Sequence, residues 1–316
     1  MSAVSVVIPS HNAAAYIVQT VTSVLAQTMP ELELLLVDDG STDDTVALVQ
    51  ALGDPRLRVI RLANGGVCRA RNRGIAEAQS PLICLLDHDD WWLPDKLQRQ
   101  LQVLTEHPAA GVAYSTFERW HADPATGRFP PPESFDFSAV ADGIDPDFSG
   151  WVHHQFLLDC WMLTSTSMFR REVFDRCGVF DESLPFSEDW DLWLRAARVF
   201  PFVQLRRPTT LYRMHAGQGS GYHRPIDYRT RLLERTAAEY GLASRDGRAI
   251  TRRQFKRQMA RYHADFARGE LEAGRPATAL RIYAHAWGLH PTGWKYPVYL
   301  AATLAGWRGG ALAARV

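Results

Sequence analysis

The sequence predicts an α/β protein with a mostly parallel sheet flanked by helices, followed by an α-helical appendage. Three observations predict this class. Short apolar runs alternate with amphipathic stretches over the first 115 residues, polar clusters directly follow three of the runs, and the chain beyond residue 226 becomes helical and rich in Ala and Arg. Such alternation is typical of βαβ units, in which helices connect parallel strands.

The expected elements of the first part follow one another in regular order. Residues 4–8 are expected to form a buried strand, and the helical spacing of Ile17, Val21 and Val24 predicts a helix over residues 13–28. Three more strand–helix pairs follow, and Pro94 marks the start of the last helix. The further strands are expected at 32–37, 58–62 and 82–86, and the further helices at 42–52, 66–79 and 95–106.

The later part of the chain changes in composition. Residues 121–150 are rich in Pro, Gly and Asp, which predicts a long loop that serves as a lid or an insertion. A helix is expected over residues 188–199. We therefore expect a first domain over 1–225, divided near residue 115, and a helical C-terminal extension over 226–316.

Composition excludes several classes of protein. The 35 basic residues equal the 35 acidic ones, which argues against a nucleic-acid binder that relies on phosphate contacts. The four cysteines show no metal-binding spacing, Cys84 is expected to be a buried inert thiol, and a reducing cytoplasm fits best. No signal peptide and no membrane-spanning segment are expected. A basic face near residues 252–261 is expected to be solvated, with peripheral contact to the inner face of an anionic membrane as the alternative.

The polar clusters lie where the chemistry of such a sheet is expected. They comprise residues 9–12, 38–41 and 87–90, and each comes at the carboxyl end of an apolar strand. In open parallel sheets, ligands bind at that edge. This placement predicts a ligand site built from the three clusters.

Residues 87–90 carry three carboxylates within four positions, Asp87, Asp89 and Asp90. Their mutual repulsion would be relieved by a divalent cation, and oxygen ligands favour Mg²⁺ or Mn²⁺ over zinc. The alternative is a solvated acidic turn that caps the following helix. The position directly after an apolar strand favours the cation.

Three other positions each allow a functional and a structural interpretation. Asp39 could accept hydrogen bonds from a base or ribose, with Ser41 or Thr42 capping the next helix, or it could serve only in turn chemistry. Arginines such as Arg71 pair with phosphate, although an exposed helix face is the alternative. An acid at the start of the 188–199 helix could be a general base or merely favourable for the helix N-terminus, and position alone does not choose between Glu188 and Asp189.

Taken together, these segments resemble the inverting glycosyltransferases of family 2, which have the GT-A fold. The resemblance covers roughly residues 1–222 in the expected order. The matching stretches are Val6–Asn12, Val37–Asp43, Asn64–Gly66 with Ala70–Gly74, Leu86–Asp90, Glu188–Arg195 and Tyr212–His215.

The resemblance implies that residues 1–115 form a nucleotide-binding half and residues 116–225 an acceptor half of the first domain. It also implies a role for each matching position. The nucleotide would be contacted by Pro9, Asp39 and Arg71, with Asp39 facing the base. Asp87 and Asp89 match the DxD pair, in which Asp89 would contact Mn²⁺ or Mg²⁺ and Asp87 would lie nearer the ribose or donor sugar. His215 is similar to a histidine that approaches the metal or pyrophosphate, and Asp189 matches the catalytic base.

The implied activity is transfer of a sugar from a nucleotide-diphosphate sugar, with UDP favoured, to an acceptor hydroxyl in the synthesis of surface polysaccharide or glycoconjugate. The acceptor would be a saccharide, a lipid-linked saccharide or a glycoprotein, and no nucleic-acid partner is expected. Trp151, Trp161 and Trp190 are candidates for stacking on sugar rings, whereas Trp193 is expected in the core. The alternatives are a nucleotidyltransferase of sugar phosphates and a non-catalytic sugar-nucleotide or glycan-binding module.

Overall fold

The computed structural model describes residues 2–219 and 223–308, and the chain divides into two compact units. The first unit comprises the chain up to Phe156 together with Cys160–Ala216, and the second comprises Leu157–Asp159 and the chain from Gly217. Compactness thus places the division after Ala216. The predicted domain ranges 1–225 and 226–316 stay a prediction.

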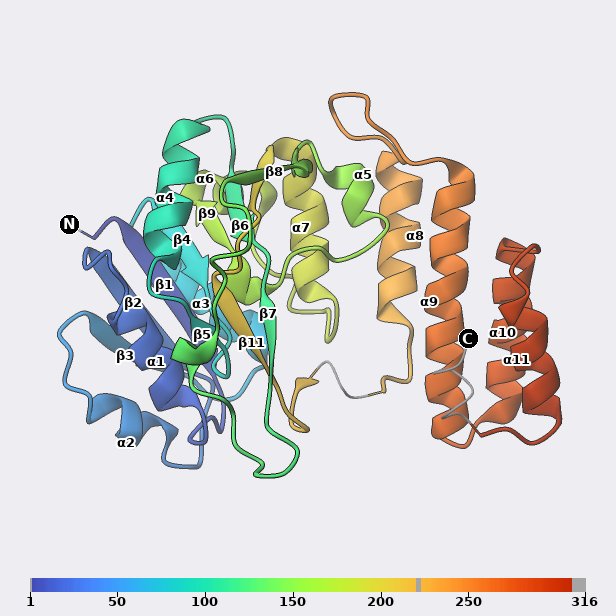
Figure 1. Ribbon diagram of the computed structural model, residues 1–316, viewed down its shortest axis with the longest axis horizontal. Coiled ribbons are helices and arrows are strands. Elements are labelled where there is room, and N and C mark those ends of the chain that lie inside the picture. The colour runs from blue at the N-terminus through green and yellow to red at the C-terminus, as the bar shows by residue number, and fades with distance from the viewer. Residues whose placement is uncertain (1, 220–222, 309–316) are drawn as a thin grey trace. The chain divides into compact units, whose positions relative to one another are not determined.

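An eight-stranded, mostly parallel sheet forms the centre of the first unit (Figure 1). Its order is β3-β2-β1-β4-β9-β6-β10-β8, in which β9 and the edge strand β8 run antiparallel to their neighbours. This confirms the predicted fold class. The strands are β1 (Val4–Ser10), β2 (Leu32–Asp38), β3 (Leu57–Arg61), β4 (Leu82–Leu85), β6 (Val112–Ser115), β8 (Ile144–Gly150), β9 (Met168–Arg170) and β10 (Phe202–Leu205).

Apolar side chains on both faces of the sheet bind the helices to it. On one face Val4, Val6 and Ile8 of β1 belong to a core shared with α1, α2 and α4. On the other face α3 packs on β1 and β2, and Trp193 of α7 stacks on Phe169 of β9. The helices are α1 (Ile17–Leu25), α2 (Thr45–Gln50), α3 (Val67–Glu77), α4 (Lys96–Glu106), α5 (His153–Phe156), α6 (Arg171–Cys177) and α7 (Glu188–Val199).

A small second sheet lies next to the carboxyl end of β4. Its order is β5-β11-β7, with β5 (Trp91–Trp92), β7 (Glu118–His121) and β11 (Thr210–Met214). Buried Trp120 and Leu211 pack with Phe137, which belongs to the segment that follows β7. Two short 3₁₀ helices, η1 (Pro132–Ser134) and η2 (Thr164–Thr166), complete the unit.

The predicted elements of the first 115 residues are present, but the helices are shorter than expected. Helix α1 covers nine of the sixteen positions expected from 13 to 28, since its first turn begins only at Ile17. The prediction of a long loop over 121–150 is wrong for its last residues, because residues 144–150 form strand β8, which pairs with β10. The helix expected over 188–199 has those bounds.

The second unit is helical, as expected for the chain beyond residue 226. It contains α8 (Tyr228–Tyr240), α9 (Arg252–Glu272), α10 (Pro276–Leu289) and α11 (Lys295–Leu304). Helices α9 and α10 pack against each other through small residues such as Ala260, Ala279 and Ala286, around Tyr283. Across the described ranges, we find no helix with the length and apolar character that crossing a membrane requires.

Candidate active site

The acidic turn Asp87–Asp90 lies between β4 and β5, and two hydroxyls hold its backbone. The Ser165 hydroxyl accepts a hydrogen bond from the backbone N–H of Asp87 at 3.1 Å and donates one to the Asp90 carboxylate. The Thr20 hydroxyl lies 2.9 Å from the carbonyl oxygen of His88 and 2.8 Å from that of Asp90. The turn is therefore fixed from α1 and η2, two segments distant in sequence.

Each of the three carboxylates has its own protein partner. Asp87 accepts from Arg71 at 2.8 Å, Asp89 pairs with Nε2 of His215 at 2.9 Å, and Asp90 accepts the backbone N–H of Arg213 at 3.0 Å. These partners relieve much of the repulsion for which the sequence suggested a cation. The structure brings the predicted metal residues Asp89 and His215 together.

The pKa values of the neighbouring carboxyl groups of Asp89 and Asp90 are shifted in opposite directions. Asp90 is fully buried, and burial together with the charges of Asp89 and Asp87 raises its pKa well above the usual value. Burial also acts to raise the pKa of Asp89, but His215 and His88 outweigh it and hold that pKa below the usual value. Asp89 is therefore the ionised group near His215, and Asp90 is a structural one.

Arg71 of α3 connects the acidic turn to the start of α7. Its guanidinium donates to Asp87 and to Glu188, each at 2.8 Å, and lies 5.0 Å from the ring centroid of Phe180. Burial lowers the pKa of Arg71, but the two carboxylates outweigh this and raise it. Arg71 is 4% exposed, so the alternative that it lies on an exposed helix face is wrong.

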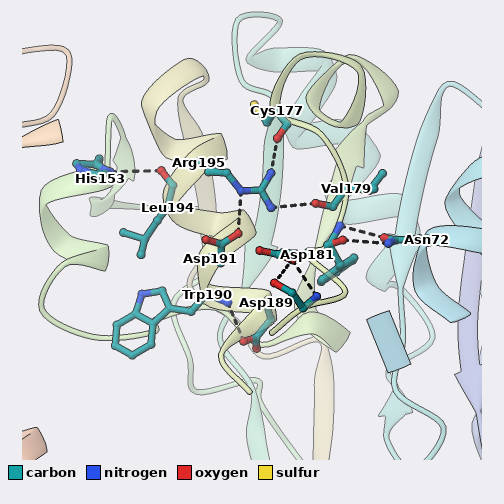
Figure 2. A network of polar contacts seen from close by, with 12 residues as sticks. Asn72, His153, Cys177, Val179, Asp181, Asp189, Trp190, Asp191, Leu194 and Arg195 are labelled. Atoms are coloured by element: carbon teal, nitrogen blue, oxygen red, sulfur yellow. Dashed lines mark hydrogen bonds and ion pairs between the residues drawn. The ribbon is translucent and has the colours of Figure 1, made fainter. Parts of the chain in front are cut away.

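Asp189 lies in the first turn of α7, and Ser187, the residue before α7, does not cap the helix with its side chain. Ser187 has φ 62° and its hydroxyl makes no capping hydrogen bond, because its backbone is left-handed. The Asp189 carboxylate accepts the backbone N–H of Trp190 at 2.7 Å (Figure 2). Burial and the neighbouring Glu188 carboxylate raise the pKa of Asp189 to about 7, although Arg71 opposes them. With Glu188 engaged by Arg71, Asp189 is the acid suited to accept a proton near neutral pH.

The segment between α6 and α7 is held by one arginine and one asparagine (Figure 2). Arg195 donates to the carbonyl oxygens of Cys177 and Val179 and to the carboxylate of Asp191. Asn72 of α3 accepts the backbone N–H of Phe180 and donates to its carbonyl, each at 2.9 Å. These hydrogen bonds hold the segment that leads into α7, and therefore the position of Asp189.

Asp39 and Pro9 lie at the ends of β2 and β1. The Asp39 carboxylate accepts the backbone N–H groups of Gly65 at 2.9 Å and Gly66 at 2.8 Å. Pro9 is buried in β1. The expected capping by Ser41 or Thr42 is wrong, since α2 begins later and neither residue is its N-cap. Asp39 thus shapes the loop before α3 at the edge where the nucleotide is expected.

Arg213 is a part of the site for which the sequence predicted no role. Its Nε donates to the backbone carbonyl of Asp89 at 2.6 Å. Its guanidinium carbon lies 4.6 Å from the ring centroid of Tyr16 and 4.0 Å from that of Trp120. The only signal was its position inside the motif that ends at His215. Ser165 and Thr20 lie in no motif, so nothing in the sequence marked them.

The four tryptophans considered for stacking on sugar rings differ in their exposure to solvent. Trp193 is fully buried, which confirms the core prediction. Trp190 is 4% exposed and its indole N–H donates to the carbonyl of Phe156, so its ring is not available for stacking. Trp151 is half-buried, and Trp161 is 40% exposed.

The donor set at Asp89 is compatible with a cation that a substrate helps to hold. Among the described residues, no group of three or more His, Cys, Asp or Glu side chains could hold a metal ion by itself. Mg²⁺ and Mn²⁺ sites commonly use one or two protein ligands, with phosphate oxygens and water completing the shell. The pair of Asp89 and His215 fits that pattern.

The fold and the site define an α/β protein with acidic side chains at the carboxyl edge of a mostly parallel sheet, where open sheets of this kind bind ligands, and with a carboxyl group of raised pKa close to that edge. Residues 5–177 match the family model described as glycosyl transferase family 2. This chain belongs to that family.

Known proteins that resemble the chain agree with this membership. An uncharacterized glycosyltransferase from Rickettsia conorii is 31% identical over 221 residues, covering 69% of this chain but 35% of that protein. Chondroitin synthase from Pasteurella multocida is 28% identical over 207 residues, covering 65% of this chain and 20% of the synthase. The chain therefore spans only a part of the length of these relatives.

Solved structures confirm the GT-A fold. S. aureus TarS 1–349 aligns with a TM-score of 0.62 at 19% identity, covering 97% of this chain and 92% of that one. The same fragment in complex with UDP-GlcNAc aligns with a TM-score of 0.61 at 22% identity, covering 85% and 72%.

Proposed function

We propose that this protein is an inverting glycosyltransferase that moves a sugar from a UDP-linked donor to an acceptor hydroxyl. One observation carries the proposal. Arg71 joins Asp87 of the acidic turn to Glu188 at the start of α7, which brings the Asp189 position next to the donor edge of the sheet. Family membership gives this arrangement its chemical meaning.

The donor nucleotide would lie across the carboxyl ends of β1, β2 and β4. Pro9 and Asp39 would contact the nucleoside, and Asp87 would face the ribose or sugar. Arg71 already neutralises Asp87, so an approaching phosphate meets less negative charge than three free carboxylates would present. The proposal of UDP is supported by the UDP-GlcNAc complex of the similar fold.

Asp189 would act as the general base. An acceptor hydroxyl attacks the anomeric carbon, the bond from that carbon to the diphosphate breaks, and the proton passes to the Asp189 carboxylate. A single displacement inverts the anomeric configuration. A carboxyl with a pKa of about 7 matches this task, because it is substantially ionised at neutral pH and still basic enough to take a proton.

Asp89 and His215 would hold Mn²⁺ or Mg²⁺ when the donor is bound. Such an ion stabilises negative charge on the departing diphosphate. Arg213 helps to position Asp89, since its Nε donates a hydrogen bond to the backbone carbonyl of Asp89. The Asp89 carboxylate is thereby positioned through its main chain as well as through His215.

The acceptor is proposed to be a saccharide, a lipid-linked saccharide or a glycoprotein, in surface polysaccharide or glycoconjugate synthesis. The names of similar proteins, chondroitin synthase and hyaluronan synthase of Pasteurella multocida, support a polysaccharide product. A cytoplasmic location stays a prediction.

The test is a panel of nucleotide-sugars, with and without Mn²⁺ or Mg²⁺. We expect one UDP-sugar with metal to raise the unfolding temperature and to be hydrolysed slowly in the absence of acceptor. If no nucleotide diphosphate or nucleotide-sugar changes the unfolding temperature under any condition, the transferase proposal is wrong. Binding without turnover, even with a broad acceptor mixture, would favour the non-catalytic module instead. Turnover of a sugar phosphate with a nucleoside triphosphate would favour the nucleotidyltransferase.

A further inference from the structure

A second pocket of the first unit lies at the β8 edge of the main sheet, apart from the acidic turn. Its volume is about 330 Å³, at the lower end of the range of roughly 300–1,000 Å³ for small-ligand pockets. None of its residues has a role in the proposed donor site. The lining residues are Thr116, Phe117, Asp145, Phe148, Trp161 and Gln204.

One wall of this pocket is an exposed and oriented aromatic surface. Trp161 is 40% exposed, and its ring centroid lies 4.9 Å from that of Phe148. The indole N–H donates to the carbonyl of Gln155 at 3.2 Å, and the Tyr114 hydroxyl donates to the carbonyl of Phe148 at 2.9 Å. The indole is therefore anchored at its polar edge while much of its apolar surface remains open to solvent.

The pocket is also lined by the side-chain amide of Gln204, a residue that is mostly buried. Gln204 of β10 is 5% exposed, and its backbone N–H is satisfied by the Ser149 hydroxyl at 3.0 Å. Within residues 2–219 and 223–308, its side-chain amide makes no hydrogen bond. The amide is not one of the solvent-inaccessible groups that lack a partner, so it is open to the pocket, where it can bind a polar group of a ligand.

A carboxylate lies beside this amide. Asp145 of β8 pairs directly with Gln204 of β10, and side chains of directly paired residues point to the same face of a sheet. Asp145 supplies hydrogen-bond acceptors only, whereas the Gln204 amide supplies both donors and an acceptor. The pair can therefore bind neighbouring hydroxyl groups in both directions.

We propose that this pocket binds one sugar ring of a saccharide acceptor, at a subsite away from the reacting atoms. A sugar ring presents an apolar C–H face and a rim of hydroxyls, which match the Trp161 ring and the Gln204–Asp145 pair. The inference rests on the proposed function for its meaning as an acceptor subsite. The pocket chemistry itself predicts saccharide binding independently of transfer.

The position of this pocket relative to the acidic turn suits an acceptor that is longer than one sugar. Strands β4 and β6 are parallel and separated only by β9, so their carboxyl ends lie about 10 Å apart at the usual strand spacing. Phe117 of the pocket packs against Tyr212 of β11, with ring centroids 5.8 Å apart. Tyr212 precedes Arg213, which bonds the Asp89 backbone. A chain bound here would extend toward the donor site along one edge of the sheet.

The test measures saccharide binding without transfer. Chitotetraose, maltotetraose and a hyaluronan tetrasaccharide are titrated into the full chain, followed by tryptophan fluorescence and calorimetry. We expect at least one to bind, and Trp161→Ala and Gln204→Leu each to weaken it by about tenfold or more, with Trp161→Phe largely restoring it. UDP binding should remain unchanged in all three variants. Trp294→Ala, at a 62% exposed tryptophan of the second unit, is the matched control and should bind normally.

The outcomes separate this inference from the proposed function. Normal binding by Trp161→Ala and Gln204→Leu would overturn the subsite, as would a wild type that binds UDP but none of the three saccharides. Because Trp161 is exposed, its replacement is not expected to unfold the chain. If saccharide binding depends on Trp161 while no nucleotide binds, the subsite stands and the proposed transferase function fails.

Discussion

Arg71 brings together carboxylates that are more than one hundred positions apart in the chain. It is buried, and its two partners, Asp87 and Glu188, come from the acidic turn and from α7. Loss of one member of such a group leaves charges without compensation, which is costly in a buried setting. The sequence predicts that Arg71 contacts the nucleotide, and this stays a prediction. The structure shows that Arg71 joins the two carboxylates.

Replacing Arg71 by Ala should therefore destabilise the protein. We expect a loss of about 2–4 kcal/mol in the free energy of unfolding, measured with urea, because Asp87 and Glu188 would repel each other unopposed. Arg73→Ala is the control on the same helix. Arg73 is half exposed and pairs with Glu77, so its loss should cost no more than about 0.5 kcal/mol. Equal losses in the two variants would contradict this account.

Asp189 should determine how the transfer rate depends on pH. Its pKa of about 7 means that the active, ionised form grows as pH rises through neutrality, so the rate should rise and then level off. Asp189→Asn should lower the rate by about 10²- to 10⁴-fold, retain UDP binding and lose this pH dependence. If the Asp189→Asn variant is fully active and the separate Glu188→Gln variant is inactive, the general base is Glu188 and not Asp189.

At the scale of elements, close contact between helix α3 and the sheet places Arg71. A Cβ atom added to Gly74 would lie 2.2 Å from Cγ1 of Val7 in β1. Gly74→Ala should therefore push α3 away and lower the free energy of unfolding by about 1–3 kcal/mol. Gly288→Ala, in α10, meets nothing within 4 Å and should leave stability unchanged or slightly higher. Thermal unfolding of both variants checks this, and an unaffected Gly74→Ala would refute the packing argument.

The same scale shows how much of the fold the sequence can predict. Strands β1, β2 and β4 were predictable because they are mainly apolar and buried on both faces of the sheet, whereas the edge strand β3 is only partly buried or exposed along its length. Strand β8 was not predictable, since residues 144–150 lie at a sheet edge and contain Asp, Pro and Gly. Pairing with β10 makes this strand, and such long-range contacts leave no local pattern.

The site was predictable to a similar extent. Asp87, Asp89 and Asp189 lie in motifs, so their positions along the chain were visible. The hydroxyl of Ser165 and the pairing of Arg71 with Glu188 depend on tertiary contacts across more than seventy positions. Residue type alone does not encode such contacts.

At the scale of the whole molecule, the net charge is zero, but basic and acidic residues are unevenly distributed between the two parts of the chain. Residues 217–316 carry 17 Lys and Arg against 7 Asp and Glu, whereas residues 1–216 carry 18 against 28. Within the second unit, Arg252, Arg253 and Lys256 line one pocket of about 390 Å³. A concentration of positive charge of this kind is attracted to anionic membrane surfaces.

Vesicle sedimentation tests this attraction. The protein should sediment with phosphatidylcholine vesicles that contain phosphatidylglycerol but not with phosphatidylcholine alone, and high salt should release it. Arg253→Glu with Lys256→Glu should abolish sedimentation, whereas the control Arg231→Glu with Arg281→Glu changes net charge equally and should retain most of it. Binding that ignores lipid charge would rule out an electrostatic membrane contact.

The donor site is the central claim, and titration calorimetry of UDP tests it most directly. With Mn²⁺ present, the wild type should bind UDP, and omission of the metal should weaken binding strongly. Asp89→Ala should bind UDP equally weakly with and without metal, because the carboxylate proposed to hold the ion is gone. If UDP binds Asp89→Ala as tightly as the wild type, with the same dependence on Mn²⁺, the assignment of the acidic turn as the donor's metal site is contradicted.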